Sequence, residues 1–313
     1  MWSRFRLLSV VCILIAAAAK PASADVVLSG PDANDGTYST ARLAKMVTVG
    51  DTVNDGTLTG ISLWGLLGGA NAASAISPAY GALTTSTPVG GNGKNAILRY
   101  YLVATGASGA TSVVSLGEID PSFGGTAAKP AFVAYQHTGG GLLATSQLVV
   151  PGAPGRNITN LASLTLLAAP ALPAQPGGVA SSVSLSGNVG HPGSYTKARL
   201  QTGFAPARET ISGNTYTGVP LWTFLGATDR NVKDQIVITQ GTDGYEVVLS
   251  LAELDSSLGG NPNDLLAYAG TGGDFPGNGM ARTVFPTDNK HGRWESNLSA
   301  VIVRTVRTVH QSQ

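Results

Sequence analysis

The sequence repeats one ordered set of segments, and this duplication constrains the fold more than any other feature. The phrase LTGISLWGLLGGA at 58–70 recurs as YTGVPLWTFLGAT at 216–228, with six of thirteen positions identical. The segment SLGEIDPSFGG at 115–125 recurs as SLAELDSSLGG at 250–260, with seven of eleven positions identical. Shorter pairs keep the same order: VVLSG and VSLSG, STARL and TKARL, and FVAY and LLAY. Self-similarity in a fixed order indicates that one structural unit occurs twice.

The spacing of the repeated blocks predicts the domain boundaries. Copy one is expected at 25–168, a linker at 169–180, copy two at 181–306 and a short tail at 307–313. The linker APALPAQPGGVA is rich in Pro and Gly, a composition typical of connecting segments. Copy one has about 23 more residues between its Trp and its Ser-Leu block than copy two, which indicates a surface insertion at about 71–94.

Residues 1–24 have the pattern of a secretory signal peptide. Arg4 and Arg6 precede the apolar run LLSVVCILIAAAA, and Ala-Ser-Ala precedes Asp25. We therefore expect a mature chain that begins near Asp25 and is periplasmic or secreted, and the apolar run is too short to span a membrane. Cys12 lies in this segment and is the only cysteine, so the mature chain is expected to be cysteine-free, with no disulfide or thiolate ligand.

The charge balance argues against nucleic acid as a partner. Without residues 1–24 the chain has 16 basic and 18 acidic residues, a net charge of about −2. Nucleic-acid-binding domains present a clustered basic surface, which this composition does not supply. Charged residues make up only 12% of the chain and glycine contributes 41 residues, which favours short strands joined by turns.

Local patterns predict a strand-rich α+β fold with short helices in each copy. Residues 40–46 and 197–201 are amphipathic, and the repeated Trp phrase predicts a short buried helix that Ser62 caps in copy one. Residues 209–218 are expected to form one strand. Turn signals predict hairpins at 100–115 and 235–250, each followed by a Ser-x-x-Glu capping box, and 298–306 alternates as a closing strand.

Copy two resembles a known family. The segments YTGVPLWTFL, IVITQGTDGYEVVLSLAEL, DLLAYAGTGG and ARTVFPTDNKHGRWESNLSAVIV are similar to the oxidoreductase molybdopterin-binding domain, the catalytic domain of the sulfite oxidase and nitrate reductase group. The resemblance covers most of 181–306 and is weaker over 25–168. It implies two tandem domains of the sulfite oxidase fold, with molybdopterin as the cofactor and a cysteine that binds its molybdenum. This chain departs from the family because its mature part has no cysteine.

The resemblance also selects candidate site residues. Lys290, His291 and Arg293 stand where the family has basic residues that contact the pterin phosphate, and Arg282 is expected to face the same pocket. Copy one keeps only Gly155 and Arg156 of this motif. A solvated loop closed by Trp294 is the alternative interpretation. The histidines are not paired at short spacing, so no metal site is predicted, and no catalytic residue is assigned.

Three functions remain open at this point. The first is a non-catalytic binding or accessory module for a small anionic ligand, which fits the missing cysteine. The second is a molybdopterin-dependent oxidoreductase in which a serine or water replaces the cysteine. The third is a structural or surface-interaction protein that uses both domains as spacers. The sequence favours the first and names neither a protein partner nor an oligomeric state.

Overall fold

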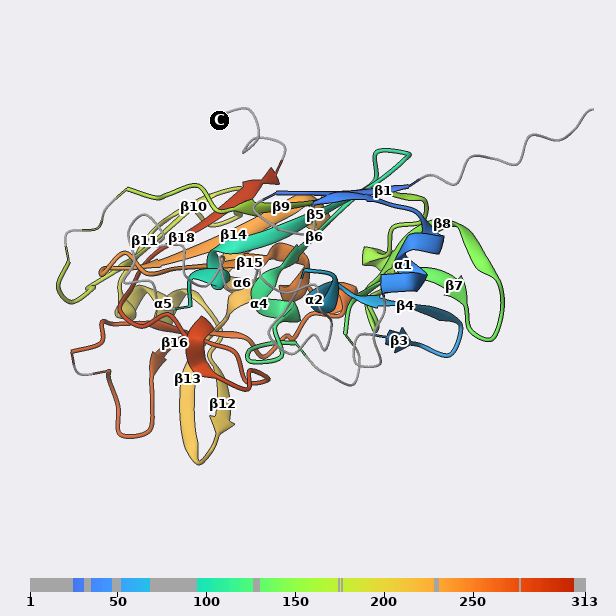
Figure 1. Ribbon diagram of the computed structural model, residues 1–313. Coiled ribbons are helices and arrows are strands. Elements are labelled where there is room, and N and C mark those ends of the chain that lie inside the picture. The colour runs from blue at the N-terminus through green and yellow to red at the C-terminus, as the bar shows by residue number, and fades with distance from the viewer. Residues whose placement is uncertain are drawn as a thin grey trace, which may run out of the picture.

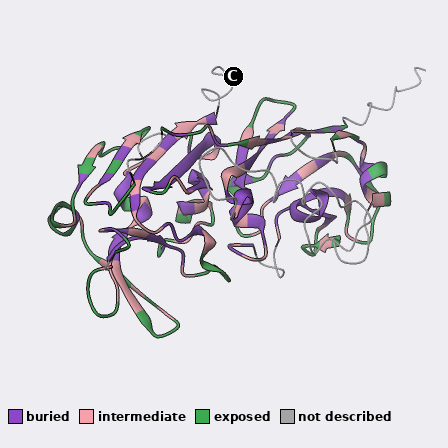
Figure 2. Ribbon diagram, turned by 60° about the vertical axis from the view of Figure 1, so that its left-hand side comes forward, coloured by how far each residue is buried: buried purple, intermediate pink, exposed green. Residues whose placement is uncertain are grey.

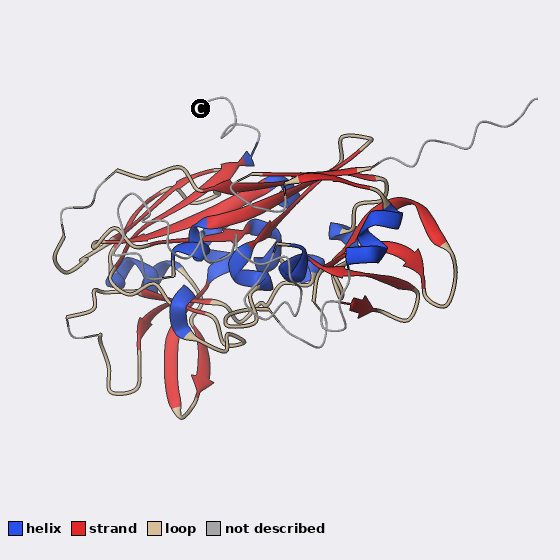
Figure 3. Ribbon diagram, in the orientation of Figure 1, coloured by secondary structure: helices blue, strands red, loops and turns tan. Residues whose placement is uncertain are grey.

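The computed structural model describes residues 25–30, 35–46, 52–67, 95–125, 130–173, 175, 177–227, 231–275 and 277–306. Within these residues the chain forms four β-sheets in two groups, with short helices between them (Figures 1 and 3). The predicted strand-rich α+β class is confirmed. The predicted signal peptide at 1–24, the predicted insertion at about 71–94 and the predicted tail at 307–313 lie outside the described residues.

Each copy builds a five-stranded sheet with the same strand order. In copy one the order is β2 (Gly36–Tyr38), β1 (Val26–Ser29), β9 (Leu161–Ala168), β5 (Tyr100–Gly106) and β6 (Thr111–Ser115). In copy two it is β11 (Gly193–Tyr195), β10 (Val183–Gly187), β18 (Leu298–Thr305), β14 (Gln235–Gly241) and β15 (Glu246–Ser250). In both sheets the first strand of the copy pairs in parallel with its last strand. The sequence repeat is therefore a repeat of topology.

A four-stranded antiparallel sheet completes each copy. In copy one it contains β3 (Thr52–Asn54), β4 (Leu58–Ser62), β7 (Phe132–His137) and β8 (Leu142–Val149). In copy two it contains β12 (Ala207–Ile211), β13 (Asn214–Pro220), β16 (Leu265–Ala269) and β17 (Arg282–Val284). The two larger sheets lie along the upper side of Figure 1, and the smaller sheets lie below them at opposite ends.

Short helical segments occupy the space between the sheets. Copy one has α1 (Thr40–Met46), α2 (Leu63–Leu66), η1 (Ala96–Arg99), α4 (Leu116–Ile119) and η2 (Pro154–Arg156). Copy two has α5 (Lys197–Gly203), α6 (Leu221–Leu225), η3 (Val232–Asp234), η4 (Leu251–Leu254), η5 (Ser256–Leu258) and η6 (His291–Arg293). Figure 2 shows that buried residues concentrate where these segments face the sheets. One apolar cluster contains residues of both copies, so the copies share a core.

Several local predictions are confirmed. Both hairpins form, as β5–β6 and β14–β15. Ser62 caps α2, since its hydroxyl accepts a hydrogen bond from the Gly65 amide at 2.9 Å. Both capping boxes are present, at Ser115 before α4 and at Ser250 before η4.

The prediction of one strand at 209–218 was wrong. These residues belong to the hairpin β12–β13, in which Ile211 pairs with Asn214 and two residues form the turn. Ser212 and Gly213 have φ values of 51° and 81°. Two successive left-handed residues form the tight turn whose twist matches that of paired strands. The Ser212-Gly213 dipeptide is a turn signal that the single-strand interpretation overlooked.

The two copies pack through the ends of their larger sheets. Strand β6 lies beside β15, η1 contacts β15, and η3 contacts β6 in the reciprocal arrangement. The predicted linker is packed as well: Ala169 and Leu172 are buried against both sheets, and the Leu172 amide donates to the Glu246 carboxylate at 3.1 Å. This packing brings the capping boxes of the two copies together.

Candidate functional site

A buried polar cluster joins the two copies at their capping boxes. In each copy a serine at the end of a strand holds a glutamate three residues later, because each group satisfies a free helix-terminal amide. Each serine also bonds to the glutamate of the other copy. The Ser115 hydroxyl donates to Glu253 Oε1 at 2.9 Å, and the Ser250 hydroxyl donates to Glu118 Oε1 at 3.2 Å.

Two arginines at equivalent positions complete this cluster. Arg156 ends η2 and Arg293 ends η6, and each is only 3% exposed. Arg156 forms a bidentate ion pair with Glu118, in which Nη1 lies 2.9 Å from Oε2 and Nη2 lies 2.7 Å from Oε1. Arg293 donates from Nη1 to Glu253 Oε2 at 2.6 Å. The six residues Ser115, Glu118, Arg156, Ser250, Glu253 and Arg293 are called the inter-copy network below.

Asp288 adds a third carboxylate on the copy-two side. It accepts hydrogen bonds from Arg293 Nε at 2.9 Å and Nη2 at 2.5 Å. Arg293 therefore has a carboxylate acceptor at each of its three nitrogens. Arg156 also donates from Nη2 to the Val113 carbonyl at 2.9 Å and to the Ser250 hydroxyl at 3.2 Å. Buried charges of this kind are stable only when paired and hydrogen-bonded.

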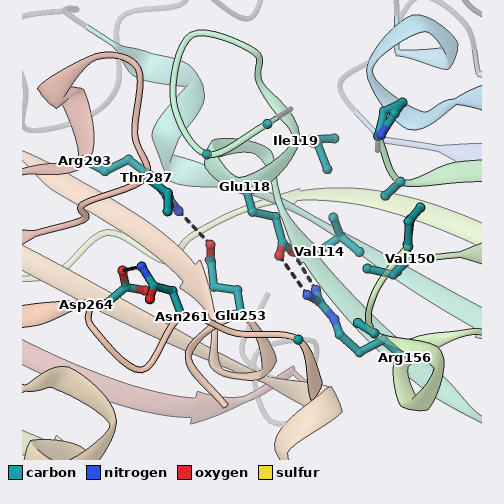
Figure 4. A pocket seen from close by; sticks show the side chains of 17 residues that line it. Val114, Glu118, Ile119, Val150, Arg156, Glu253, Asn261, Asp264, Thr287 and Arg293 are labelled. Atoms are coloured by element: carbon teal, nitrogen blue, oxygen red, sulfur yellow. Dashed lines mark hydrogen bonds and ion pairs between the residues drawn. The ribbon is translucent and has the colours of Figure 1, made fainter. Parts of the chain in front are cut away.

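A cavity of about 290 Å³ opens beside the inter-copy network. Figure 4 shows that Glu118 and Arg156 from copy one and Glu253, Asp264 and Arg293 from copy two converge on it. This space is called the central cavity. Apolar side chains, among them those of Val114, Ile119 and Val150, form part of its wall.

Burial raises the pKa values of three acids in this region, Glu253, Asp264 and Asp288. The pKa of Glu253 rises to about 7, first because the carboxyl is buried and then because Glu118 lies close, while Arg293 opposes the shift. Burial raises the pKa of Asp264 well above its usual range, and its carboxyl accepts a hydrogen bond from the Asn261 amide at 3.1 Å. Burial also raises the pKa of Asp288. Near pH 7 the Glu253 carboxyl is therefore only partly ionised.

The free energy of unfolding should fall as pH rises from 4.5, the ordinary pKa of Glu253, to about 7, its pKa in the folded chain. The folded chain binds this proton more tightly than the unfolded chain. Its stabilising effect is therefore complete below the unfolded pKa and is lost as pH rises through the folded pKa, by at most about 3 kcal/mol. Glu253→Gln, which cannot titrate, should flatten the pH profile in urea unfolding. An unchanged slope in this variant would show that Glu253 does not carry the effect.

Two of the four predicted site residues line a second cavity. Lys290 and His291 are exposed at a cavity of about 530 Å³, called the rim cavity, whose other walls include Phe123, Tyr245 and Trp294. The His291 ring stacks on Trp294 with a centroid distance of 3.7 Å and an interplanar angle of 15°. Lys290 Nζ donates to the Ser122 hydroxyl of copy one at 3.4 Å.

Both copies contribute to the rim cavity. The Tyr245 hydroxyl donates to the Gly292 carbonyl at 2.8 Å, and the Asn95 side-chain amide of copy one donates to the same hydroxyl at 3.1 Å. Glu295 also lines this cavity, and burial raises its pKa well above the usual range. The cavity thus exists only where the two copies are packed together.

The other two predicted residues lie elsewhere. Arg293 lines the central cavity, where its donors are used by Glu253 and Asp288. Arg282 lines neither cavity: its guanidinium lies 5.1 Å from the Phe275 ring centroid and hydrogen-bonds to the Ser296 hydroxyl. The structure thus places Lys290 and His291 at the rim cavity, whereas Arg282 bonds to Ser296 of the cavity wall and does not line the cavity itself.

Sequence reasoning missed the inter-copy network as a unit. It assigned Glu118 and Glu253 to helix caps alone and did not select Asp264 or Asp288. One signal was available, because Ser-x-x-Glu and Gly-Arg are kept in both copies at matching positions.

Comparisons with known proteins give no further assignment. The chain has no match among protein-family models or curated proteins. Among the described residues, no group of three or more His, Cys, Asp or Glu side chains is placed to hold a metal ion. No helix in the described ranges is long and apolar enough to cross a lipid bilayer.

Proposed function

We propose that the chain is a periplasmic or secreted, non-catalytic binding module that holds a small anionic molecule in the rim cavity. The observation that carries the proposal is the exposed pair Lys290 and His291 at the mouth of a cavity with aromatic walls. A lysine ammonium and an imidazole supply hydrogen-bond donors suited to phosphate, sulfate or carboxylate oxygens.

The surroundings of this pair are compatible with an anion. Burial favours the neutral form of Glu295, so its carboxyl repels a negative ligand less than an ionised carboxylate would. Asp243 also lines the cavity, and its carboxylate already accepts a hydrogen bond from the Tyr245 amide at 3.0 Å. Trp294 is held by its indole N–H, which donates to the Phe285 carbonyl at 3.2 Å, so the wall behind His291 is fixed in place.

The described residues do not fit a molybdenum cofactor bound as in the resembling family. They include no cysteine, and Arg293, which the resemblance would give to the pterin phosphate, has carboxylate partners at all three nitrogens. Molybdenum and tungsten analysis of the purified protein tests the oxidoreductase alternative. A stoichiometric amount of either metal would favour that alternative over a binding module.

Inorganic phosphate should raise the melting temperature of the protein, and the double variant Lys290→Gln, His291→Gln should weaken phosphate binding about tenfold. The reason is the loss of both ligand-facing donors at the rim cavity. Calorimetric titration and thermal shift at constant ionic strength provide the measurement. The matched control is Arg208→Gln, which removes an exposed cation from β12, away from both cavities.

Two outcomes would count against the proposal. The first is equal phosphate affinity in wild type and the double variant, which would place the anion elsewhere. The second is a melting temperature that responds to phosphate no more than to chloride. A structural or surface-interaction role would then be the better explanation for the two packed domains.

A further inference from the structure

The ionisable side chains of the rim cavity are arranged as an acidic end and a basic end. The acidic end contains Asp243 and Glu295, and the basic end contains Lys290 and His291. Tyr245 spans the distance between them. Its backbone amide donates to Asp243 Oδ1 at 3.0 Å, and its hydroxyl donates at 2.8 Å to the carbonyl of the residue that follows His291. The two ends are therefore separated by roughly the length of a tyrosine residue.

Two carboxyl groups lie side by side at the acidic end, and neither has an ion-pair partner in the described part of the chain. A Cβ added to Gly241 would lie 2.6 Å from Glu295 Oε1 and 2.8 Å from Asp243 Oδ1. Glu295 is only 1% exposed, so contact with a ligand falls to Asp243, which is exposed at the turn between β14 and β15. Asp243 uses one oxygen for the Tyr245 amide, and its other oxygen accepts no hydrogen bond from the described residues.

Copy one holds the basic end in place. The Asn289 amide donates to the Phe123 carbonyl at 3.1 Å, and the Asn289 side chain donates to the Pro121 carbonyl at 2.9 Å. Lys290 Nζ uses one of its three N–H donors for the Ser122 hydroxyl, which leaves two for a ligand. These bonds order the loop before a ligand arrives, which reduces the entropy lost on binding.

We propose that the rim cavity binds a zwitterionic amino acid, with its carboxylate at Lys290 and His291 and its ammonium group at Asp243. This inference rests on the function proposed above and adds a positive charge to the molecule that carries the anionic group. A simple anion would face the Asp243 carboxylate without compensation, whereas an amino acid complements both ends of the cavity. Charge-assisted hydrogen bonds at two separate points would also fix the orientation of the ligand.

The walls between the two ends favour an amino acid with an aromatic side chain. They include Phe123, Tyr245 and Trp294, and the His291 ring stacks on Trp294. The cavity volume of about 530 Å³ lies in the range typical of small-molecule sites, which combine aromatic walls with a few polar groups. L-Phenylalanine is therefore the probe of choice.

The experiment titrates the full chain at neutral pH and constant ionic strength with L-phenylalanine and two analogues. Hydrocinnamate lacks the ammonium group, and phenethylamine lacks the carboxylate. L-Phenylalanine should bind at least about tenfold more tightly than either analogue, because each analogue loses one charge-assisted hydrogen bond. Calorimetry measures the affinities, and the melting temperature should rise with the concentration of L-phenylalanine.

Asp243→Asn should weaken L-phenylalanine binding about tenfold without weakening phosphate binding, because it removes only a negative charge. Asparagine keeps an oxygen for the Tyr245 amide, so the turn is retained. The matched control is Asp55→Asn in copy one. Asp55 is also an exposed turn aspartate, which accepts a hydrogen bond from the Thr57 amide at 2.9 Å, and it lines neither cavity. Both ligands should bind this control as they bind the wild type.

The outcomes separate this inference from the function on which it rests. If phosphate binds through Lys290 and His291 but hydrocinnamate binds as tightly as L-phenylalanine, the binding module stands and the amino acid is overturned. Equal affinity for phenethylamine, or unchanged L-phenylalanine affinity in Asp243→Asn, would overturn it as well. A wild-type chain that responds to neither phosphate nor L-phenylalanine would overturn both proposals.

Discussion

Arg293→Met is expected to lower the free energy of unfolding by about 3–5 kcal/mol at pH 8. The variant removes the partner of two buried carboxylates, Glu253 and Asp288, and leaves both without a neutralising charge. Methionine fills much of the same volume, so the loss reports on charge pairing more than on packing. Equilibrium unfolding in urea measures the effect, with the exposed Arg208→Met as the control, which should change stability by less than about 0.5 kcal/mol.

The same variant carries an internal check through pH. Burial already raises the pKa values of Glu253 and Asp288, and loss of Arg293 raises them further because the opposing charge is gone. The penalty should therefore shrink at pH 5, where protonation removes the unpaired charges. A loss that is equally large at pH 5 and pH 8 would mean that packing, rather than charge, is responsible.

Gly218→Ala is expected to cost about 3 kcal/mol, at the upper end of the range for overpacking a core. A Cβ at this position would lie 2.2 Å from the Leu266 carbonyl oxygen and 2.6 Å from the Ala267 Cα. Both obstacles are backbone atoms of the neighbouring strand β16, which cannot move without breaking the sheet. The matching glycine of the repeated phrase in copy one has the same restriction, since a Cβ at Gly60 would lie 2.2 Å from the Val133 carbonyl oxygen.

The matched control for this prediction is Gly203→Ala. Gly203 ends α5, and a Cβ added there meets no atom within 4 Å. Alanine should be neutral or stabilise the chain by about 0.4–1 kcal/mol, because it restricts the unfolded state. If thermal unfolding shows equal losses for the two variants, close backbone approach is not what the glycine of the repeated phrase provides.

Much of the local structure could be predicted because it depends on neighbouring residues. Alternation and turn residues indicated both hairpins, and Ser-x-x-Glu indicated both capping boxes. The β12–β13 hairpin was missed although Ser212-Gly213 is a dipeptide that marks turns, because the flanking residues were assigned to one continuous strand.

The candidate sites were harder to predict because their residues come from distant segments. The basic motif near Trp294 predicted Lys290 and His291 as neighbours, and both line the rim cavity. The same motif gave no sign that Arg293 turns inward to Glu253 and Asp288. The direction of a side chain from a short loop depends on which acids the rest of the fold places beneath it.

The sequence by itself determined that one unit occurs twice, which short elements each unit contains, and in what order. These properties follow from repeated blocks and from periodicity, which are local. Tertiary structure alone decided that Ser115 bonds to Glu253, a residue 138 positions away, and that Arg156 Nε has no acceptor while its counterpart does. Those outcomes depend on how two similar domains pack against each other, and long-range packing is set by shape and burial across the whole chain.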